Sequence, residues 1–98
     1  FASKKFDAVV VTNYLFRPKL AALFDLVADD GYLAYETFAV GNAAFGRPKN
    51  PDFLLHEGEL PAALPAGFDI IDAFHGVVSD PQPAVIQRLA ARRINPSQ

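Results

Sequence analysis

The first hydrophobic segment of the chain is an almost unbroken apolar run over residues 6–12, which turns polar at Asn13 and then meets Pro18. Because the run is rich in valine and nearly continuous, it is typical of a strand that is covered on both faces inside a parallel sheet. The polar residues then stand at the carboxyl end of that strand, where open α/β sheets bind ligands. The pattern therefore predicts a buried strand that leads into a binding site.

A helix is predicted after this strand. Pro18 suits the first turn of a helix, since its missing N–H would have no partner there. The apolar residues that follow recur at helical spacing and form one stripe: Leu20, Leu23, Phe24 and Val27. Gly31 is the expected stop, with Asp29 and Asp30 in the turn before it.

A second strand is predicted over residues 32–38, so that the first third of the chain forms a strand, a helix and a parallel strand. From residue 40 to residue 55 the periodicity disappears, and glycines and prolines punctuate a long connection. Loops of this length are uncommon unless they are functional or disordered. Three phenylalanines favour an ordered loop that is pinned to the domain and suited to be a lid: Phe38, Phe45 and Phe53.

The remaining sequence predicts a short helix over residues 57–64 and a strand near the sheet edge over residues 68–75. Residues 84–94 carry two conflicting patterns. Their spacing and composition favour a helix, whereas the turn over residues 79–83 favours a hairpin into a final antiparallel strand. The pattern of residues leaves both structures open.

Composition narrows the class of protein. The 98 residues suffice for one small domain, and the net charge of -2 provides no basic field for nucleic acid. The absence of cysteine excludes disulfides and thiolate metal sites. No apolar run reaches the roughly 20 residues that span a bilayer. We therefore expect a cytoplasmic protein without nucleic-acid or membrane partners, and we expect part of a longer protein because no initiator methionine is present.

Candidate chemistry gathers at the ends of the two predicted parallel strands. Asn13, Tyr14 and Arg17 follow the first strand, and Glu36 and Thr37 end the second. Since the carboxyl ends of parallel strands meet at one edge of a sheet, these polar residues form a candidate site. No metal site is predicted, because the two histidines have no ligand spacing, and no phosphate-binding or nucleophile-elbow motif occurs.

Glu36 has two interpretations. A carboxylate between Tyr35 and Phe38 on an otherwise apolar strand needs a partner or a shifted pKa, which favours a functional role. Alternatively, Glu36 forms a structural ion pair with Arg17 or Arg47.

Two segments resemble strands four and five of class I S-adenosylmethionine-dependent methyltransferases, namely residues 6–18 (FDAVVVTNYLFRP) and 30–38 (DGYLAYETF). The loop over residues 41–55 (GNAAFGRPKNPDFLL), with Glu59 and Leu60 beyond it, resembles a bacterial subgroup related to tellurite-resistance-type methyltransferases. The resemblance extends over the whole chain. It implies an α/β, Rossmann-like methyltransferase fold, of which residues 1–98 form the C-terminal half with strands four to seven.

The resemblance also implies roles and topology. The last strand would be antiparallel and inserted between the fifth and sixth, which favours a strand over residues 84–92. Asn13, Tyr14 and Arg17 would lie beside the S-adenosylmethionine cofactor. Four residues would lie on the side of the substrate, an unidentified small-molecule methyl acceptor: Glu36, Thr37, Arg47 and Asn50. Catalysis would rest on positioning and desolvation, and no catalytic base is assigned.

Two family features have no counterpart in the chain, the glycine-rich loop after strand one and the acidic residue that ends strand two. The isolated chain is therefore expected to be inactive and not to hold S-adenosylmethionine. The strand over residues 6–12 would also lack its usual neighbour, and an unpaired apolar edge invites pairing with another copy. A homo-oligomer through this edge is predicted. The alternative to an enzyme is a non-enzymatic interaction module that uses the same edge.

Overall fold

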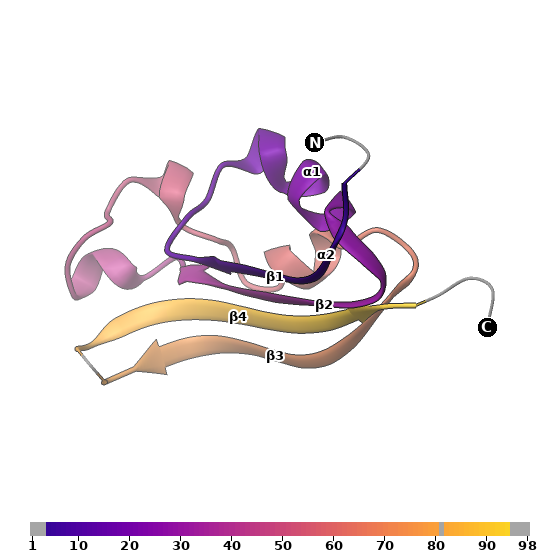
Figure 1. Cartoon of the computed structure of the whole chain (residues 1–98). Helices are drawn as coiled ribbons and strands as arrows, with labels where there is room; N and C mark the ends of the chain where they lie inside the picture. Colours follow the sequence, from indigo (N-terminus) through magenta and orange to yellow (C-terminus); the bar gives the residue numbers. More distant parts are fainter. Residues whose placement is uncertain (1–3, 81, 95–98) are drawn as a thin grey trace.

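The computed structural model describes residues 4–80 and 82–94, and within them one four-stranded sheet organises the molecule (Figure 1). The strands are β1 (Phe6–Thr12), β2 (Val27–Phe38), β3 (Phe68–Val78) and β4 (Ala84–Arg93), in the spatial order β1-β2-β4-β3. β1 and β2 run parallel, as the hydrophobic pattern predicts. β4 lies between β2 and β3 and is antiparallel to both. The strand alternative for residues 84–94 is therefore confirmed, together with the inserted, antiparallel position of the last strand.

The connection from β1 to β2 contains a shorter helix than the pattern predicts. A 3-10 turn, η1 (Arg17–Lys19), leads into α1 (Leu20–Asp25), and Val27 already belongs to β2, opposite Phe6 of β1. The predicted turn at Asp29 and Asp30 is also wrong. The register changes between Phe6 and Ala8, so that residues 28–31 of β2 bulge within the strand.

Gly31 lies in this bulge and does not terminate the helix. A Cβ atom on Gly31 would stand 2.8 Å from the carbonyl oxygen of Ala28 and 3.0 Å from that of Asp7. Since real Cβ atoms do not approach oxygen so closely, the bulge requires a residue without a side chain. The glycine is therefore explained by the close approach of two backbone segments.

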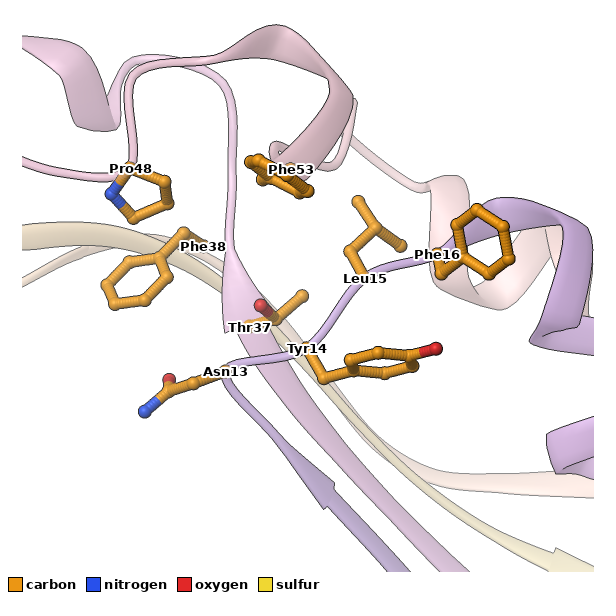
Figure 2. A pocket seen from close by; sticks show the side chains of 8 residues that line it. All are labelled: Asn13, Tyr14, Leu15, Phe16, Thr37, Phe38, Pro48 and Phe53. Carbon is orange, nitrogen blue, oxygen red and sulfur yellow. The ribbon is translucent and has the colours of Figure 1, made fainter.

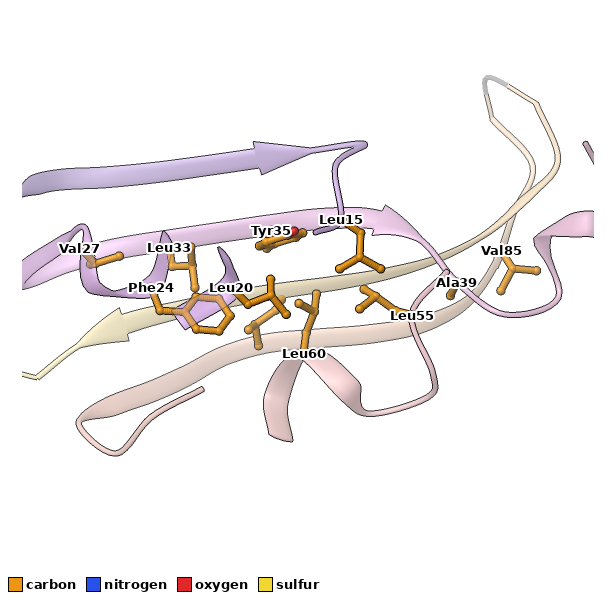
Figure 3. Close-up of a cluster of buried hydrophobic side chains, with 11 residues drawn as sticks. Leu15, Leu20, Phe24, Val27, Leu33, Tyr35, Ala39, Leu55, Leu60 and Val85 are labelled. Carbon is orange, nitrogen blue, oxygen red and sulfur yellow. The ribbon is translucent and has the colours of Figure 1, made fainter. Parts of the chain in front are cut away.

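The hydrophobic core lies on one face of the sheet. Side chains of α1, of the long loop and of α2 (Glu59–Ala63) pack there against alternate residues of β2 and β4 (Figure 3). The fully buried members include Phe24, Leu60, Leu33, Tyr35 and Leu89. Both helices thus cover the same face, and we call the opposite one the open face. No helix in the described ranges is long and apolar enough to cross a membrane.

β1 is the edge strand of this sheet, and the prediction that it is buried on both faces is wrong. Only β2 pairs with β1 among the described residues. Val10 points to the open face beside Ala34 and is 70% exposed, while Val9 and Val11 on the other face are partly buried against the core. The predicted placement of β3 near the sheet edge is confirmed.

Candidate functional site

The carboxyl ends of β1 and β2 meet, as predicted, and the N–H of Asn13 donates to the carbonyl oxygen of Glu36 over 2.9 Å. Above this edge lies a cavity of about 500 Å³, which we call the apolar cavity. Figure 2 shows the side chains that line it, none of which carries a charge: Asn13, Tyr14, Leu15, Phe16, Thr37, Phe38, Pro48 and Phe53. Three predicted site residues thus come together, Asn13 and Tyr14 from the cofactor side and Thr37 from the substrate side.

The backbone after β1 is held in a defined path. Asn13 has a φ of 54°, in the left-handed region that asparagine tolerates better than most residues. The hydroxyl of Tyr35 then donates to the carbonyl oxygen of Tyr14 over 2.6 Å. Burial raises the pKa of Tyr35 to about 12, so this phenol stays protonated and keeps its donor at neutral pH. Tyr35, a residue of the buried core, thereby fixes the backbone segment that contains Tyr14.

Arg17 has a structural role. Its Nε and Nη2 atoms lie 2.6 and 2.9 Å from the two carboxylate oxygens of Glu59 in α2. The same guanidinium donates to the carbonyl oxygens of Asp52 and Leu54, at 3.1 and 2.7 Å. These bonds tie η1 to α2 and to η3 (Pro51–Phe53), so Arg17 positions the loop that forms one wall of the apolar cavity.

Glu36 forms an ion pair with Arg88 of β4, with 2.8 Å between Oε1 and Nε. The structural interpretation of Glu36 is thus correct in kind, but both predicted partners, Arg17 and Arg47, are wrong. Successive residues of a strand point to opposite faces, so Glu36 lies on the open face and Thr37 on the core face. The two predicted substrate-side residues do not share a cavity.

A second cavity of about 460 Å³ lies at the same edge of the sheet, towards the open face. We call it the polar cavity because of six of its lining residues: Asn13, Glu36, Asn42, Arg47, Asp80 and Gln82. Asn13 and Phe38 line both cavities and therefore stand between them. Arg47, a predicted substrate-side residue, thus joins Glu36 and Asn13 here.

The long loop is ordered, but the phenylalanines do not pin it as predicted. Phe45 and Phe53 are 48% and 50% exposed. The anchor is buried Asn42, whose Nδ2 donates to the carbonyl oxygen of Pro48 over 3.2 Å and whose Oδ1 accepts the N–H of Val85 over 3.0 Å. Leu55 adds two backbone bonds, to Phe38 and Val40.

Asn50, the remaining substrate-side candidate, caps η3. Its Oδ1 accepts the N–H of Asp52 over 2.9 Å, and its side chain borders a hollow shared with Arg47 and Phe53. It lines neither the apolar nor the polar cavity. The predicted cluster of seven residues is therefore divided between two cavities and two structural contacts.

Gln87 and Asp80 were not predicted from the sequence as residues of interest. Gln87 is buried in β4, where Oε1 accepts the N–H of Leu60 and Nε2 donates to the carbonyl oxygen of His56, both over 2.7 Å. A glutamine directly after the apolar residues 84–86 was a usable signal, because a buried amide needs partners. Nothing in the local sequence marked Asp80. Within residues 4–80 and 82–94 no three His, Cys, Asp or Glu side chains are placed to hold a metal ion.

The four strands and their cover form a mixed α/β sheet with a methyltransferase-like fold. One similar solved structure is TehB from Haemophilus influenzae, a tellurite-resistance methyltransferase, with a TM-score of 0.65 and 15% sequence identity. Another similar structure is that of an echinomycin biosynthesis enzyme, described for the conversion of a disulfide bond into a thioacetal group. Its TM-score is 0.64 and its sequence identity to this chain is 12%.

The two alignments include 93% and 98% of this chain but only 36% and 53% of the respective neighbours. The chain thus spans about a third to a half of the length of these proteins. No protein-family profile matches the sequence, and no curated protein matches it. The similarity therefore concerns the fold.

Proposed function

We propose that this chain is the C-terminal part of an S-adenosylmethionine-dependent methyltransferase that acts on a small molecule. The observation that carries the proposal is the uncharged, aromatic cavity at the carboxyl ends of two parallel strands. In open α/β sheets this is the place where ligands bind. The methyltransferase-like fold of the two structural neighbours adds support from an independent direction.

The cavity fits one part of S-adenosylmethionine. When bound, this cofactor supplies an electrophilic methyl group on a positively charged sulfur. Aromatic faces attract such cations, and Tyr14, Phe16 and Phe53 present exposed rings at the apolar cavity. The residues that line the cavity include no carboxylate for the ribose hydroxyls and no cation for the methionine carboxylate. The cavity thus suits the sulfonium end of the cofactor and provides no charged contacts for its ribose or its methionine carboxylate.

The residues of the chain then have separable tasks. Tyr14, Phe38 and Phe53 keep water away from the reacting end, which favours a step in which charge is lost from sulfur. Asn13 lies between the two cavities, where its amide is placed to orient a ligand in either one. Arg17, through Glu59 and the carbonyl oxygens of the loop, holds the wall in position.

The proposal is tested by titrating the 98-residue chain with S-adenosylmethionine and following backbone amide signals by NMR. We expect weak binding, with a Kd of about 1 mM or above, and shifts at Tyr14, Leu15 and Thr37. S-Adenosylhomocysteine, which lacks the positive charge, is expected to bind about two- to fivefold more weakly, because cation–π attraction is lost.

Two variants give the matched comparison. Tyr14→Ala removes an aromatic wall of the cavity and is expected to abolish the shifts, whereas Tyr32→Ala removes a tyrosine on the open face that lines neither cavity and is expected to keep them. Equal binding of the two ligands, or shifts away from the apolar cavity, would argue against the proposed site. Low-micromolar binding by calorimetry would contradict the view that the main cofactor contacts lie elsewhere.

The exposed edge of β1 favours a second candidate function, a non-enzymatic interaction module. An edge strand with apolar side chains offers unpaired backbone groups to a partner. The coding sequence upstream of Phe1 discriminates between the two functions. A glycine-rich strand–loop–helix segment there supports the enzyme, and a start codon directly before Phe1 supports the module.

A further inference from the structure

The polar cavity is built from three separate parts of the chain. The ends of β1 and β2 contribute Asn13, Glu36 and Phe38, the loop contributes Arg47, and the β3–β4 turn region contributes Asp80. Buried Asn42 joins the loop to β4 through the N–H of Val85 and thereby fixes two of these parts together. The cavity is thus a composite of secondary-structure elements and an anchored loop.

Two opposite charges line this cavity without a partner in the described part of the chain. Within the described residues, Arg47 and Asp80 form no hydrogen bond or ion pair, with each other or with any other residue, so their charged atoms lie more than 4.0 Å apart. The third ionic group, Glu36, is already occupied by Arg88. A ligand in the cavity therefore meets one available cation and one available anion.

The cavity also has apolar surface, to which Phe38, Phe45 and Ile86 contribute. Its volume of about 460 Å³ falls within the usual range for small-molecule sites, roughly 300–1,000 Å³. A polyanion such as a nucleotide phosphate is disfavoured, because Asp80 and Glu36 outnumber the single unpaired cation.

We propose that the polar cavity binds a small zwitterion with an apolar body, of the amino-acid class. Its carboxylate pairs with Arg47, its ammonium group with Asp80, and its side chain packs on Phe38 and Ile86. Because Asn13 and Phe38 also line the apolar cavity, the bound molecule lies next to the proposed methyl donor. Its role as methyl acceptor rests on the proposed function, whereas its binding does not.

The test uses three probes that differ only in charge: L-phenylalanine, 3-phenylpropanoate without the ammonium group, and 2-phenylethylamine without the carboxylate. Each is titrated into the 98-residue chain and followed by amide NMR. L-Phenylalanine is expected to bind about tenfold more tightly than either truncated probe, with shifts at Gly46 and Ala84, because each truncated probe lacks one of the two charged contacts. Equal affinities for all three probes would overturn the proposal, without any variant being needed.

Three variants assign the contacts. Arg47→Gln is expected to weaken the binding of L-phenylalanine about tenfold and to leave that of 2-phenylethylamine, which has no carboxylate, unchanged. Asp80→Asn is expected to weaken L-phenylalanine to the same extent and to leave 3-phenylpropanoate, which has no ammonium group, unchanged. Lys49→Gln removes a cation of the same loop that does not line the cavity and is expected to change nothing. Equal losses in Arg47→Gln and Lys49→Gln would overturn the assignment. The cofactor titration at the apolar cavity is a separate measurement, so either proposal can fail while the other stands.

Discussion

Arg17 and Glu59 are separated by 42 positions in the sequence, yet they form a two-point ion pair that organises the loop around the apolar cavity. The hydrogen bonds from Arg17 lower the pKa of the Glu59 carboxyl below its ordinary value of 4.5, although partial burial opposes them. The same bond raises the pKa of Arg17. At the scale of single residues, this pair is therefore a contact that acid weakens.

Its effect on stability has a definite sign. Because the folded-state pKa of Glu59 is depressed, the pair stabilises the fold above pH 4.5 and loses that contribution as the pH falls through the lower folded value. We expect Glu59→Gln to reduce the free energy of unfolding at pH 7 and to flatten its decline below pH 4.5. Urea unfolding at pH 7 and pH 3 measures both.

Glu57→Gln is the matched control, since Glu57 is exposed and has no ion-pair partner among the described residues. Asp25, whose pKa is lowered by its bond to Lys5, contributes to the acid sensitivity of both variants and cancels in the comparison. An unfolding profile of Glu59→Gln that runs parallel to that of Glu57→Gln would show that the pair has no net effect.

A second prediction concerns the buried side chain of Gln87. Replacing it with leucine keeps the size of the side chain but leaves the buried N–H of Leu60 and the carbonyl of His56 without their partner. Two such losses are expected to cost about 2–4 kcal/mol of unfolding free energy. Urea unfolding checks this value against Gln82→Leu, an exposed glutamine that should change stability by about 0.5 kcal/mol or less. A similar effect for both substitutions would contradict the role of Gln87.

Individual residues also show how much of the candidate site could be predicted from the sequence. Asn13, Tyr14 and Thr37 were predictable as neighbours, because the carboxyl ends of parallel strands meet whatever the rest of the chain does. The partners of Arg17 and Glu36 were not predictable. Glu36 pairs with Arg88 at a distance of 52 positions, and such pairs depend on the order of strands in the sheet, which local patterns do not encode.

At the scale of elements, the bulge in β2 yields a prediction about Gly31. Alanine there would place Cβ 2.8 Å from the carbonyl oxygen of Ala28, and neither of the two backbone segments is free to move independently of the β1–β2 pairing. We expect Gly31→Ala to lower the unfolding free energy by about 1–3 kcal/mol. Thermal and urea unfolding measure the change.

Ala34 provides the comparison for Gly31 because it lies on the same strand and is exposed on the open face. Ala34→Ser should alter stability by about 0.5 kcal/mol or less. If Gly31→Ala were equally mild, the bulge would have to be more adaptable than its backbone contacts indicate.

The same bulge explains why the helix was predicted too long. Leu20, Leu23, Phe24 and Val27 share helical spacing, but Val27 reaches the core from a strand, with the same burial as Phe24. Hydrophobic periodicity reports which residues face the core and not which backbone brings them there. For β1 the error is of another kind. Its apolar run indicates side chains suited to burial, yet the surroundings of an element depend on contacts beyond its own sequence.

At the scale of the whole molecule, the described sheet has two unequal sides. One face is covered by helices and loop, while the open face and the edge of β1 expose Val10 and Tyr32, at 70% and 53%. The N–H of Asn13 points to β2, and the N–H groups of successive residues in a strand point to opposite sides, so that those of residues 11 and 9 also point to β2. The backbone N–H of Val10 therefore points outward from the sheet.

We expect the 98-residue chain to self-associate through this edge, with the two β1 strands pairing about a two-fold axis. In an antiparallel pairing with Val9 opposite Val9 of the second copy, Ala8 of each copy lies opposite Val10 of the other. This register brings no like charges together. Val10→Pro removes the outward N–H without breaking the β1–β2 ladder and is expected to shift the chain from dimer to monomer in sedimentation equilibrium. Val10→Thr keeps the N–H and should keep the dimer. A monomeric wild-type chain with strong hydrogen-exchange protection at Val9 to Val11 would contradict this assembly, because the edge would then be stable without a partner strand.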